Sequence, residues 1–361
     1  MTPTKRLHDL GQSLWLDNIS RDLLTSGTLE RYIDEFSVTG VTSNPTIFNH
    51  AIKDSSAYDM AIRGEQRSTA PAEELFFDLA LQDIVRAADL FAPIHNRSSG
   101  VDGWVSLEVS PLLAHDAAGT LAAAKDLFAR AARRNVFIKI PGTQESLPAV
   151  EEAIFAGIPV NVTLLFSMEH YTAAAEAVLR GIERRIDARL NPDVASVASV
   201  FVSRWDSAVA GIVPPELRNK LGIAVAKRIY GKYQSLLNSA RWQRVYNFGA
   251  RPQRLLWAST GMKDREAPDT QYITALAAPC TVNTMPEATL KAFADHGDLD
   301  GALSADSVSV DKTLAEFVNR GIDVDQLAVQ LQEDGARAFV TSWTELLTVI
   351  GARSAQLRKA S

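Results

Sequence analysis

The sequence predicts an α/β protein with a (β/α)₈ barrel, in which eight parallel strands alternate with helices. Short apolar runs rich in β-branched residues recur, segments of helical periodicity separate them, and no G-x-G-x-x-G turn follows any run. Eight such buried strands close naturally into a barrel, whereas an open doubly wound sheet usually carries that glycine turn. The expected strands are 13–18, 38–44, 103–110, 136–142, 158–166, 197–204, 254–260 and 280–286.

Amphipathic helices are expected between these strands, the clearest of them after residues 70, 118, 166 and 215. Ser167 and Thr120 stand where helices are expected to start, and Gly157 and Gly181 stand where helices are expected to stop. The gaps after the second and sixth strands are long enough to hold more than one helix each. These patterns predict an outer layer of helices around the barrel.

A single domain over residues 1–361 is expected, because the chain has no repeat and no linker rich in Pro, Gly or Ser. The segment from about 322 to 357 carries leucines at helical spacing. We therefore expect additional helix there, packed outside the barrel.

Composition excludes several classes of function. The formal charge is -6 and the basic residues are spread along the chain, which argues against a nucleic-acid or anionic-membrane surface. One cysteine, Cys280, allows neither an intramolecular disulfide nor a thiolate metal cluster, and the six histidines form no H-E-x-x-H motif. A zinc site is therefore not expected. No signal peptide and no stretch of about 18 apolar residues is found, so a cytoplasmic location is expected.

Polar side chains stand at the carboxyl ends of the expected strands, where barrels of this kind place their active sites. Lys139 lies in the apolar run 137–140, Glu108 lies in 105–109, and Asp17 follows a third apolar run. An unpaired charge buried in such a strand costs several kcal/mol, so each charge is expected either to have an ion-pair partner or to serve the function of the protein. Further polar residues at strand ends are Asn44, Asn161, Thr163, Ser199, Arg204 and Ser259, with Lys263 in the next loop.

Two interpretations of these residues stay open at this point. Lys139 either extends its amine toward solvent or pairs with a carboxylate such as Glu108, or it serves as an amine nucleophile that forms a Schiff base with a ketone. An ordinary lysine, with a pKa of about 10.4, is almost fully protonated at pH 7, but burial can lower that pKa by about 3 or more. Asn44 either caps the next helix or binds a ligand. Two carboxylates beside a lysine supply what carbon–carbon bond chemistry needs: an electron sink, a base and an acid.

Seven short motifs then follow one another across nearly the whole chain: TGVTSNPTIF (39–48), VSLEVSP (105–111), FIKIPGT (137–143), GIPVNVTLLFS (157–167), VFVSRWD (200–206), RLLWAST (254–260) and TVNTMPEATL (281–290). Together they resemble the transaldolase family, and the last two resemble its longer bacterial branch. Agreement of several consecutive motifs is far more specific than any one of them. The resemblance implies a metal-free class I aldol transfer on a (β/α)₈ barrel, for which no cofactor is expected.

The resemblance also implies a role for each strand-end residue. Lys139 matches the Schiff-base lysine, and Asp17 matches the aspartate that takes the donor hydroxyl proton. Glu108 and Thr163 match the pair that positions a catalytic water. The remaining matches are to substrate-binding positions: Asn44 and Asn161 for hydroxyls and the carbinolamine, Ser199, Arg204 and Ser259 for hydroxyl and phosphate groups, and Phe201 for a ring near the site.

One departure from the family pattern concerns the second phosphate cation. Many relatives carry an arginine soon after the serine of the seventh strand, but here residues 259–263 read STGMK. Lys263 is therefore the expected substitute, although lysine supplies a point charge where arginine supplies a bidentate fork.

The implied reaction moves a dihydroxyacetone unit from sedoheptulose 7-phosphate to glyceraldehyde 3-phosphate, giving erythrose 4-phosphate and fructose 6-phosphate. Its partners are then sugar phosphates. The rivals are a class I aldolase of the fructose-6-phosphate type, which releases the donor unit, and a non-catalytic sugar-phosphate-binding barrel. A buried lysine argues against the last, because binding alone does not need one. The sequence leaves monomer and homodimer open.

Overall fold

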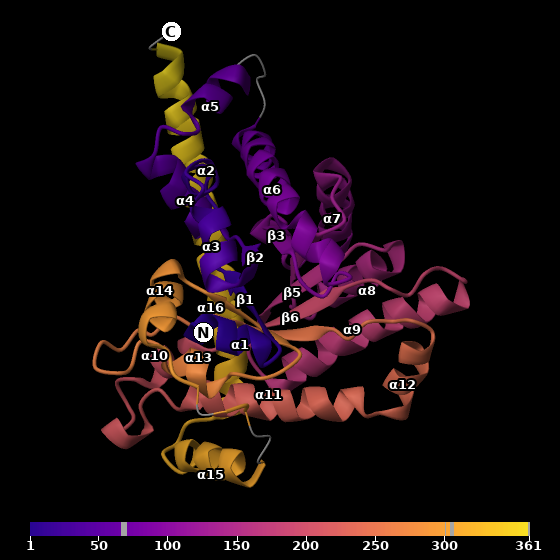
Figure 1. Ribbon diagram of the computed structural model, residues 1–361, viewed down its shortest axis with the longest axis vertical. Coiled ribbons are helices and arrows are strands. Elements are labelled where there is room, and N and C mark those ends of the chain that lie inside the picture. The colour runs from indigo at the N-terminus through magenta and orange to yellow at the C-terminus, as the bar shows by residue number, and fades with distance from the viewer. Residues whose placement is uncertain (66–70, 300, 304–306, 360–361) are drawn as a thin grey trace.

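The computed structural model describes residues 1–65, 71–299, 301–303 and 307–359, and its centre is a closed barrel of eight strands (Figure 1). All neighbouring strands are parallel and follow sequence order around the barrel, which confirms the predicted (β/α)₈ fold. Each strand overlaps one of the eight predicted runs. The strands are β1 Gln12–Leu16, β2 Val38–Thr42, β3 Trp104–Glu108, β4 Val136–Pro141, β5 Val160–Leu165, β6 Ser196–Phe201, β7 Arg254–Ala258 and β8 Thr281–Met285.

Helices surround the barrel and fill the long gaps after β2 and β6, as the sequence predicts. None of the described helices is both long enough and apolar enough to cross a bilayer. The α-helices are α1 Pro3–Asp9, α2 Arg21–Thr25, α3 Thr28–Phe36, α4 Pro45–Asp54, α5 Asp59–Glu65, α6 Ala72–Arg97, α7 Ala117–Ala131, α8 Leu147–Ala156, α9 Met168–Asp187, α10 Ser203–Val209, α11 Leu221–Leu237, α12 Ala240–Asn247, α13 Gln271–Ala275, α14 Glu287–His296, α15 Ser307–Val318 and α16 Val324–Lys359, with short 3₁₀ turns at Pro111–Leu113 and Pro215–Leu217.

Two predicted helix starts have different outcomes. Ser167 caps α9 as expected, because its hydroxyl accepts a hydrogen bond from the His170 amide at 3.1 Å. The expected start of α7 at Thr120 is wrong. Asp116 is the capping residue, since its carboxylate accepts a hydrogen bond from the Gly119 amide at 3.0 Å.

The two glycines predicted to stop helices also differ. Gly157 ends α8 with a φ of 86°, the left-handed conformation that glycine adopts without strain. Gly181 does not end α9, which continues to Asp187. At Gly181 a Cβ would come within 2.7 Å of the Glu151 carbonyl oxygen. That glycine therefore permits close packing of α9 on α8.

Strand register brings three predicted site residues side by side inside the barrel. Glu108 of β3 pairs with Lys139 of β4, and Lys139 pairs with Asn161 of β5. Side chains alternate between the two faces of a strand, so residues in register on neighbouring strands point the same way. The parallel pairing thus turns three distant sequence positions into one row of polar groups.

The long helix α16 closes part of one end of the barrel, and it is the yellow helix that descends from the C-terminus at the top of Figure 1. The Gln332 amide donates hydrogen bonds to the carbonyl oxygens of Gly142, at 3.1 Å, and Leu164, at 2.9 Å. Both carbonyls lie at the carboxyl ends of β4 and β5. A Cβ at Gly335 would lie 2.9 Å from the Leu164 side chain, so glycine allows this close approach. These contacts bring Phe339, one turn further along, to the barrel mouth.

Candidate active site

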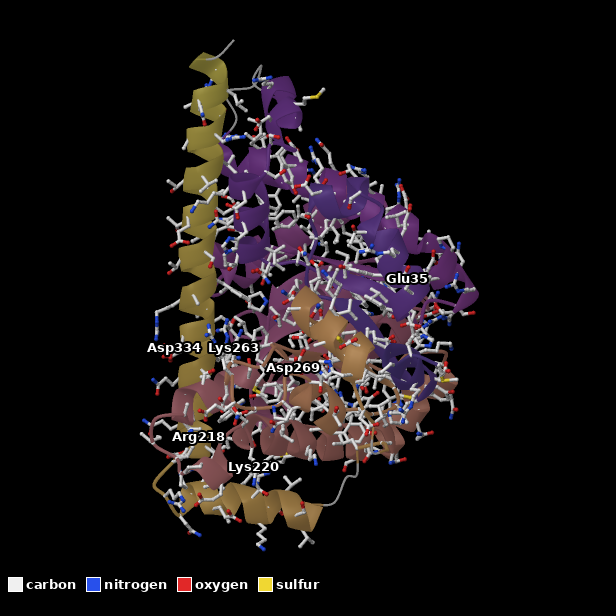
Figure 2. All side chains as sticks on the ribbon, turned by 60° about the vertical axis from the view of Figure 1, so that its left-hand side comes forward. Glu35, Arg218, Lys220, Lys263, Asp269 and Asp334 are labelled. Carbon is white, nitrogen blue, oxygen red and sulfur yellow. The ribbon has the colours of Figure 1, made fainter. Side chains whose placement is uncertain are left out.

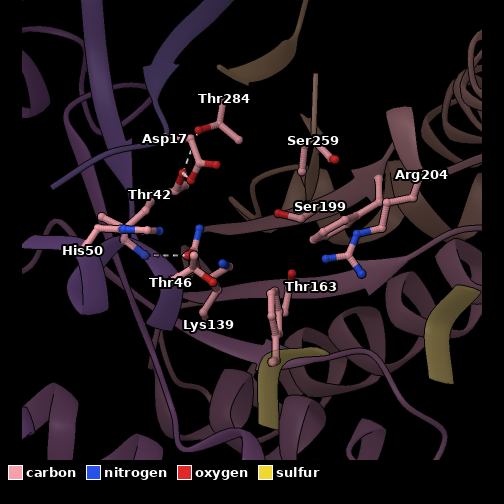
Figure 3. A pocket seen from close by; sticks show the side chains of 15 residues that line it. Asp17, Thr42, Thr46, His50, Lys139, Thr163, Ser199, Arg204, Ser259 and Thr284 are labelled. Atoms are coloured by element: carbon pink, nitrogen blue, oxygen red, sulfur yellow. Dashed lines mark hydrogen bonds between the residues drawn. The ribbon is translucent and has the colours of Figure 1, made fainter. Parts of the chain in front are cut away.

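A pocket of about 260 Å³ opens at the carboxyl ends of the strands (Figure 3). It combines hydroxyl, carboxylate, amine and guanidinium groups with a few aromatic and aliphatic walls, as small-molecule sites do. Most of the predicted site residues line it, and Glu108, Asn161 and Lys263 do not. The lining residues are Asp17, Thr42, Asn44, Thr46, Ile47, His50, Lys139, Thr163, Ser199, Phe201, Arg204, Ala258, Ser259, Thr284 and Phe339.

Lys139 enters this pocket from β4 and does not extend its amine to bulk solvent. The residue is 6% exposed, and its Nζ donates a hydrogen bond to the Ser43 carbonyl oxygen at 3.0 Å. Glu108 Oε2 lies 3.6 Å from that Nζ, so the expected pairing with a carboxylate is present, although it is longer than a hydrogen bond. A buried amine held at the pocket wall can reach a ketone bound there.

Two carboxylates share this region with the amine: Glu108 is buried beside it, and Asp17 is half-buried in the same pocket lining. Burial raises the pKa of both Asp17 and Glu108 above the ordinary values, and the positive charge of Lys139 opposes that rise. Asp17 also accepts a hydrogen bond from the Thr42 hydroxyl at 2.8 Å. A carboxylate with a raised pKa takes up and releases protons closer to neutral pH, which suits proton transfer.

Two buried oxygens next to Lys139 have no hydrogen-bond partner among the described residues. They are Glu108 Oε2 and Thr163 Oγ1. Buried polar atoms almost always have a partner, so these two are placed to bind polar groups of a guest molecule. The pair is the one that the family resemblance assigns to a catalytic water.

Asn161 lies beneath the pocket floor, where two neighbours hold its amide. Its Oδ1 accepts a hydrogen bond from the Ser199 hydroxyl at 2.7 Å, and its Nδ2 donates to the Ser106 hydroxyl at 3.2 Å. The position of Asn44 is compatible with both expected roles, as a helix cap and as a ligand-binding residue. It caps α4 by accepting from the Ile47 amide at 3.1 Å, and it also lines the pocket.

Arg204 places a positive charge on the side of the pocket opposite to Asp17 (Figure 3). It lies in the first turn of α10 and not in the sixth strand, which ends three residues earlier than predicted. Its guanidinium carbon lies 5.2 Å from the ring centre of Phe201 and 5.9 Å from that of Phe339. Burial lowers the pKa of Arg204, and no carboxylate of the described residues forms an ion pair with it. Such a cation suits an incoming anion.

Ser259 and Lys263 follow β7 but differ in position. Ser259 lines the pocket with a φ of 56°, a left-handed conformation, and its hydroxyl lies 2.8 Å from that of Ser203. Lys263 is exposed and lies outside the pocket lining (Figure 2). Lys263 lies in the loop after the carboxyl end of β7, which is the end of the barrel where the pocket opens. Its charge opposes the rise in the pKa of Asp17, after Lys139 and Thr42.

Sequence reasoning missed several lining residues. Thr42 is the last residue of β2 and Thr284 the last but one of β8, and their hydroxyls lie 2.6 Å apart, so the strand-end pattern could have found them. Thr46 and His50 lie on α4, one turn apart. Phe339 comes from α16, and no local signal places a residue of that helix in the pocket.

Comparisons with known proteins agree with this site. The family model described as Transaldolase/Fructose-6-phosphate aldolase matches residues 14–350. A curated protein named Transaldolase from Arthrobacter sp. (strain FB24) is 42% identical, with 100% of both chains covered. Two others of that name are 44% identical, one from Thermobifida fusca (strain YX), with 96% of each chain covered, and one from Parafrankia sp. (strain EAN1pec), with 96% of this chain and 97% of the relative covered. The matched residues include most of β1, all of the other seven strands and the residues that line the pocket. The chain therefore belongs to the transaldolase and fructose-6-phosphate aldolase family.

Proposed function

We propose that this protein is a transaldolase, a transferase that moves a dihydroxyacetone unit by class I aldol chemistry. The donor is sedoheptulose 7-phosphate and the acceptor is glyceraldehyde 3-phosphate. The products are erythrose 4-phosphate and fructose 6-phosphate. The observation that carries this proposal is the buried Lys139 amine at the pocket wall, 3.6 Å from Glu108.

The reaction begins when Glu108 takes a proton from the Lys139 ammonium. The freed amine attacks the donor ketone, and one amine proton passes to the ketone oxygen to give a carbinolamine. Glu108 then gives the proton that it took to the departing hydroxyl, so that water and an iminium ion form. Its raised pKa suits both steps. Glu108 Oε2 and Thr163 Oγ1, which accept no hydrogen bond from the described residues, hold this water, and the same pair delivers water again when the product is hydrolysed from the lysine.

Carbon–carbon cleavage then uses Asp17 as the base. Asp17 takes the proton of the C4 hydroxyl, the C3–C4 bond breaks, and its electron pair moves into the iminium to give an enamine on Lys139. Erythrose 4-phosphate leaves. The enamine carbon attacks the aldehyde of glyceraldehyde 3-phosphate, Asp17 returns the proton to the new hydroxyl, and hydrolysis releases fructose 6-phosphate. This sequence needs no metal or cofactor.

Other lining residues bind and orient the sugar. Asn44 holds substrate hydroxyls and the carbinolamine. Asn161 lies behind Ser199 and acts on the substrate through the Ser199 hydroxyl, which donates to it. Arg204 and Ser259 bind the phosphate, with Phe201 as the wall beside it. We propose Lys263 as a second cation that acts on the phosphate from the exposed loop.

A coupled assay separates this function from its rivals. We expect fructose 6-phosphate to be consumed only when erythrose 4-phosphate is added as acceptor, with sedoheptulose 7-phosphate formed. Release of glyceraldehyde 3-phosphate together with free dihydroxyacetone, without any acceptor, would favour the aldolase of the fructose-6-phosphate type. Tight sugar-phosphate binding without turnover would favour a binding barrel.

We further propose that the chain is one domain over residues 1–361 and that it works in the cytoplasm, where its sugar-phosphate substrates are found. The absence of a bilayer-spanning helix among the described residues is compatible with this location. Neither nucleic acid nor membrane is expected as a partner, because the formal charge is -6 and no basic block exists. A sedimentation measurement would distinguish monomer from homodimer.

A further inference from the structure

A second cavity lies at the opposite, amino-terminal end of the barrel. Its volume is about 280 Å³, and residues from five strands and the loops before them surround it. The interior of a (β/α)₈ barrel is ordinarily filled by side chains, so open space at this end is a feature that requires an explanation. The lining residues are Gly11, Trp15, Gly100, Val101, Trp104, Phe137, Ala195, Ser196, Val197, Arg251, Pro252, Arg254 and Cys280.

Aromatic rings from β1, β3 and β4 build one wall of this cavity. Trp104 stacks on Phe137 with ring centres 4.1 Å apart, and Phe137 lies 6.0 Å from Trp15. A Cβ at Gly40 of β2 would lie 2.6 Å from Trp15 Nε1. The Trp15 indole can therefore occupy this position only because residue 40 is glycine. The two lining residues from β6, Ser196 and Val197, have small side chains. The result is a flat aromatic face bordering an unfilled apolar space.

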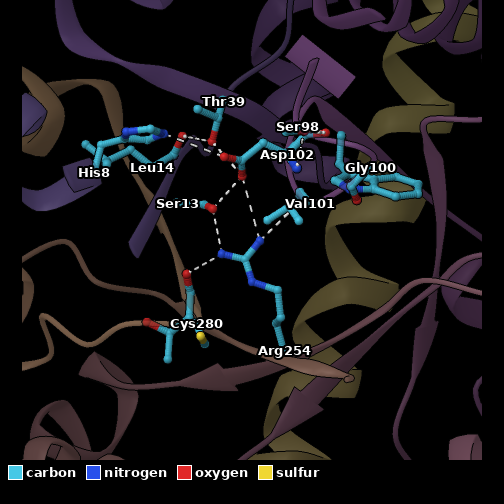
Figure 4. A network of polar contacts seen from close by, with 12 residues as sticks. His8, Ser13, Leu14, Thr39, Ser98, Gly100, Val101, Asp102, Arg254 and Cys280 are labelled. Carbon is cyan, nitrogen blue, oxygen red and sulfur yellow. Dashed lines mark hydrogen bonds and ion pairs between the residues drawn. The ribbon is translucent and has the colours of Figure 1, made fainter. Parts of the chain in front are cut away.

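Both charged residues that line this cavity are arginines. Arg254 is held rigidly: one guanidinium nitrogen donates to Ser13 Oγ at 2.6 Å and the Thr281 carbonyl at 2.7 Å, and the other donates to the Val101 carbonyl at 2.9 Å (Figure 4). Asp102 lies 3.7 Å away. The Nε of Arg254 is buried and has no partner among the described residues. Asp102 balances the charge of Arg254, so this cavity offers a free donor, the Arg254 Nε, and has no carboxylate in its lining.

A neighbouring cavity of about 410 Å³ shares Gly100, Trp104, Ala195 and Arg251 with the first. Its lining adds His95, Arg134 and Asp193, together with uncharged residues. Arg251 stands at the junction, and both its Nε and its terminal nitrogen bind Asp193.

Charge in this second cavity is again mainly positive. Arg134 forms no ion pair with the described residues and is exposed. Burial, followed by the charges of Arg134 and Arg251, lowers the pKa of His95 below its ordinary value. His95 is then neutral at pH 7. One carboxylate thus faces two arginines, which leaves this cavity attractive to an anion.

We propose that the two joined cavities form a second binding site for a small aromatic monoanion, with its ring against Trp104 and its carboxylate or sulfonate near Arg251. The apolar cavity accommodates the ring, and Arg134 leaves the lining with one positive charge more than the pair of Arg251 and Asp193 balances, which attracts the anion. This site is at the end of the barrel opposite to Lys139. It does not depend on the proposed catalytic function.

The probe for this site is 8-anilinonaphthalene-1-sulfonate, a dye that fluoresces in apolar surroundings. We expect it to bind the native protein, and we expect fructose 6-phosphate not to displace it. Cys280 is the single cysteine of the chain and lines the apolar cavity. The bound dye should therefore slow alkylation of Cys280 by iodoacetamide, which mass spectrometry measures directly.

Arg251→Gln tests the role of charge, with Arg133→Gln as a matched control. Arg133 binds Asp89 through the same two guanidinium nitrogens that Arg251 uses for Asp193, but it lines neither cavity. Loss of a charged contact should weaken dye binding about tenfold in Arg251→Gln and leave it unchanged in Arg133→Gln. The neutral analogue N-phenyl-1-naphthylamine should bind both variants equally.

A second variant tests the apolar part of the site. Val197→Phe should fill part of the apolar cavity and weaken the binding of both the anionic and the neutral dye. An unchanged melting temperature would show that the variant is still folded. The proposal is overturned if the native protein does not bind the anionic dye, if fructose 6-phosphate displaces it, or if Cys280 reacts equally fast with the dye bound. Equal dye affinity in native protein and Arg251→Gln would also overturn it.

Discussion

Lys139 Nζ and Glu108 Oε2 lie 3.6 Å apart inside the barrel, and each side chain is 8% exposed. Their register on neighbouring strands sets this distance, because β3 and β4 pair Glu108 directly with Lys139. Removing one member of a buried ion pair leaves the other charge uncompensated, at a cost of about 3–5 kcal/mol. Substitutions here must therefore keep a polar group of similar size.

The two carboxylates are expected to fail at different steps when each is replaced by its amide. Asp17→Asn should suppress carbon–carbon cleavage more than imine formation, because the base for the C4 hydroxyl is lost. Glu108→Gln should slow imine formation itself, because no acid remains to protonate the departing hydroxyl. Rapid mixing with fructose 6-phosphate followed by borohydride trapping measures adduct formation separately from turnover.

Equal losses in both steps for both variants would mean that Asp17 and Glu108 only support Lys139. Far-ultraviolet circular dichroism and melting temperature serve as controls for folding. A trapped adduct that accumulates in Asp17→Asn without turnover would support Asp17 as the base for cleavage and Glu108 as the acid for imine formation.

Phe339 is expected to contribute to substrate use from a helix distant in sequence. Its ring centre lies 5.7 Å from Lys139 Nζ and 5.9 Å from the Arg204 guanidinium. Cation–π contacts contribute about 0.5–2 kcal/mol, so Phe339→Leu should lower kcat/KM about 2- to 30-fold. The matched control is Phe77→Leu, which also loses a ring packed on α16, at Trp343, but lines no part of the pocket. Equal kinetic losses in both variants would contradict a role at the site.

Arg204 and Lys263 are expected to act on the phosphate and not on the bond that breaks. A charged hydrogen bond contributes about 1.5–3 kcal/mol, so each alanine variant should weaken use of fructose 6-phosphate about ten- to a hundredfold. Unphosphorylated dihydroxyacetone as donor should be used almost as well as by the native protein. A residue whose loss harms both donors equally supports the fold or the lysine, and its phosphate assignment is then wrong.

Asp206 is expected to make the fold more stable in mild acid. Burial raises its pKa to about 6, although Tyr272 and the amides of Leu221 and Gly222 donate hydrogen bonds to it. In the unfolded chain this carboxyl has an ordinary pKa near 3.8. Between these two values the folded protein binds more protons than the unfolded chain, so this group stabilises the fold as the pH falls through 6.

The measurement is the free energy of unfolding in urea at pH 7 and at pH 4, for native protein and Asp206→Asn. Asparagine keeps an acceptor for the two amides and does not titrate. The native protein should gain up to roughly 3 kcal/mol from this group on going to pH 4, and the variant should lack that gain. Identical pH dependence in the two proteins would contradict a raised pKa at Asp206.

The barrel and most of the pocket could be predicted from sequence because both follow from short-range patterns. Each strand is an apolar run, and a charge such as Lys139 or Glu108 at its end is costly unless it has a partner or a use. Helix boundaries were less predictable. The sequence pattern predicts Arg204 in a strand, but α10 begins one residue before it, at Ser203.

Long-range contacts set the rest of the site, and sequence patterns do not carry them. Phe339 reaches the pocket because Gln332 binds carbonyls at the ends of two strands and Gly335 lets α16 come close. Nothing near residue 339 signals this. The cavity at the opposite end likewise depends on how Trp15 fits over Gly40, which only tertiary packing shows.

Covalent trapping tests the central claim, that Lys139 forms a Schiff base with the donor. Native protein is incubated with fructose 6-phosphate and sodium borohydride, digested, and examined by mass spectrometry. One three-carbon unit should appear on Lys139, with activity lost in proportion, and Lys139→Arg should be inactive and unlabelled, because arginine stays protonated. A label on another lysine, or full activity without any label on Lys139, would contradict the account.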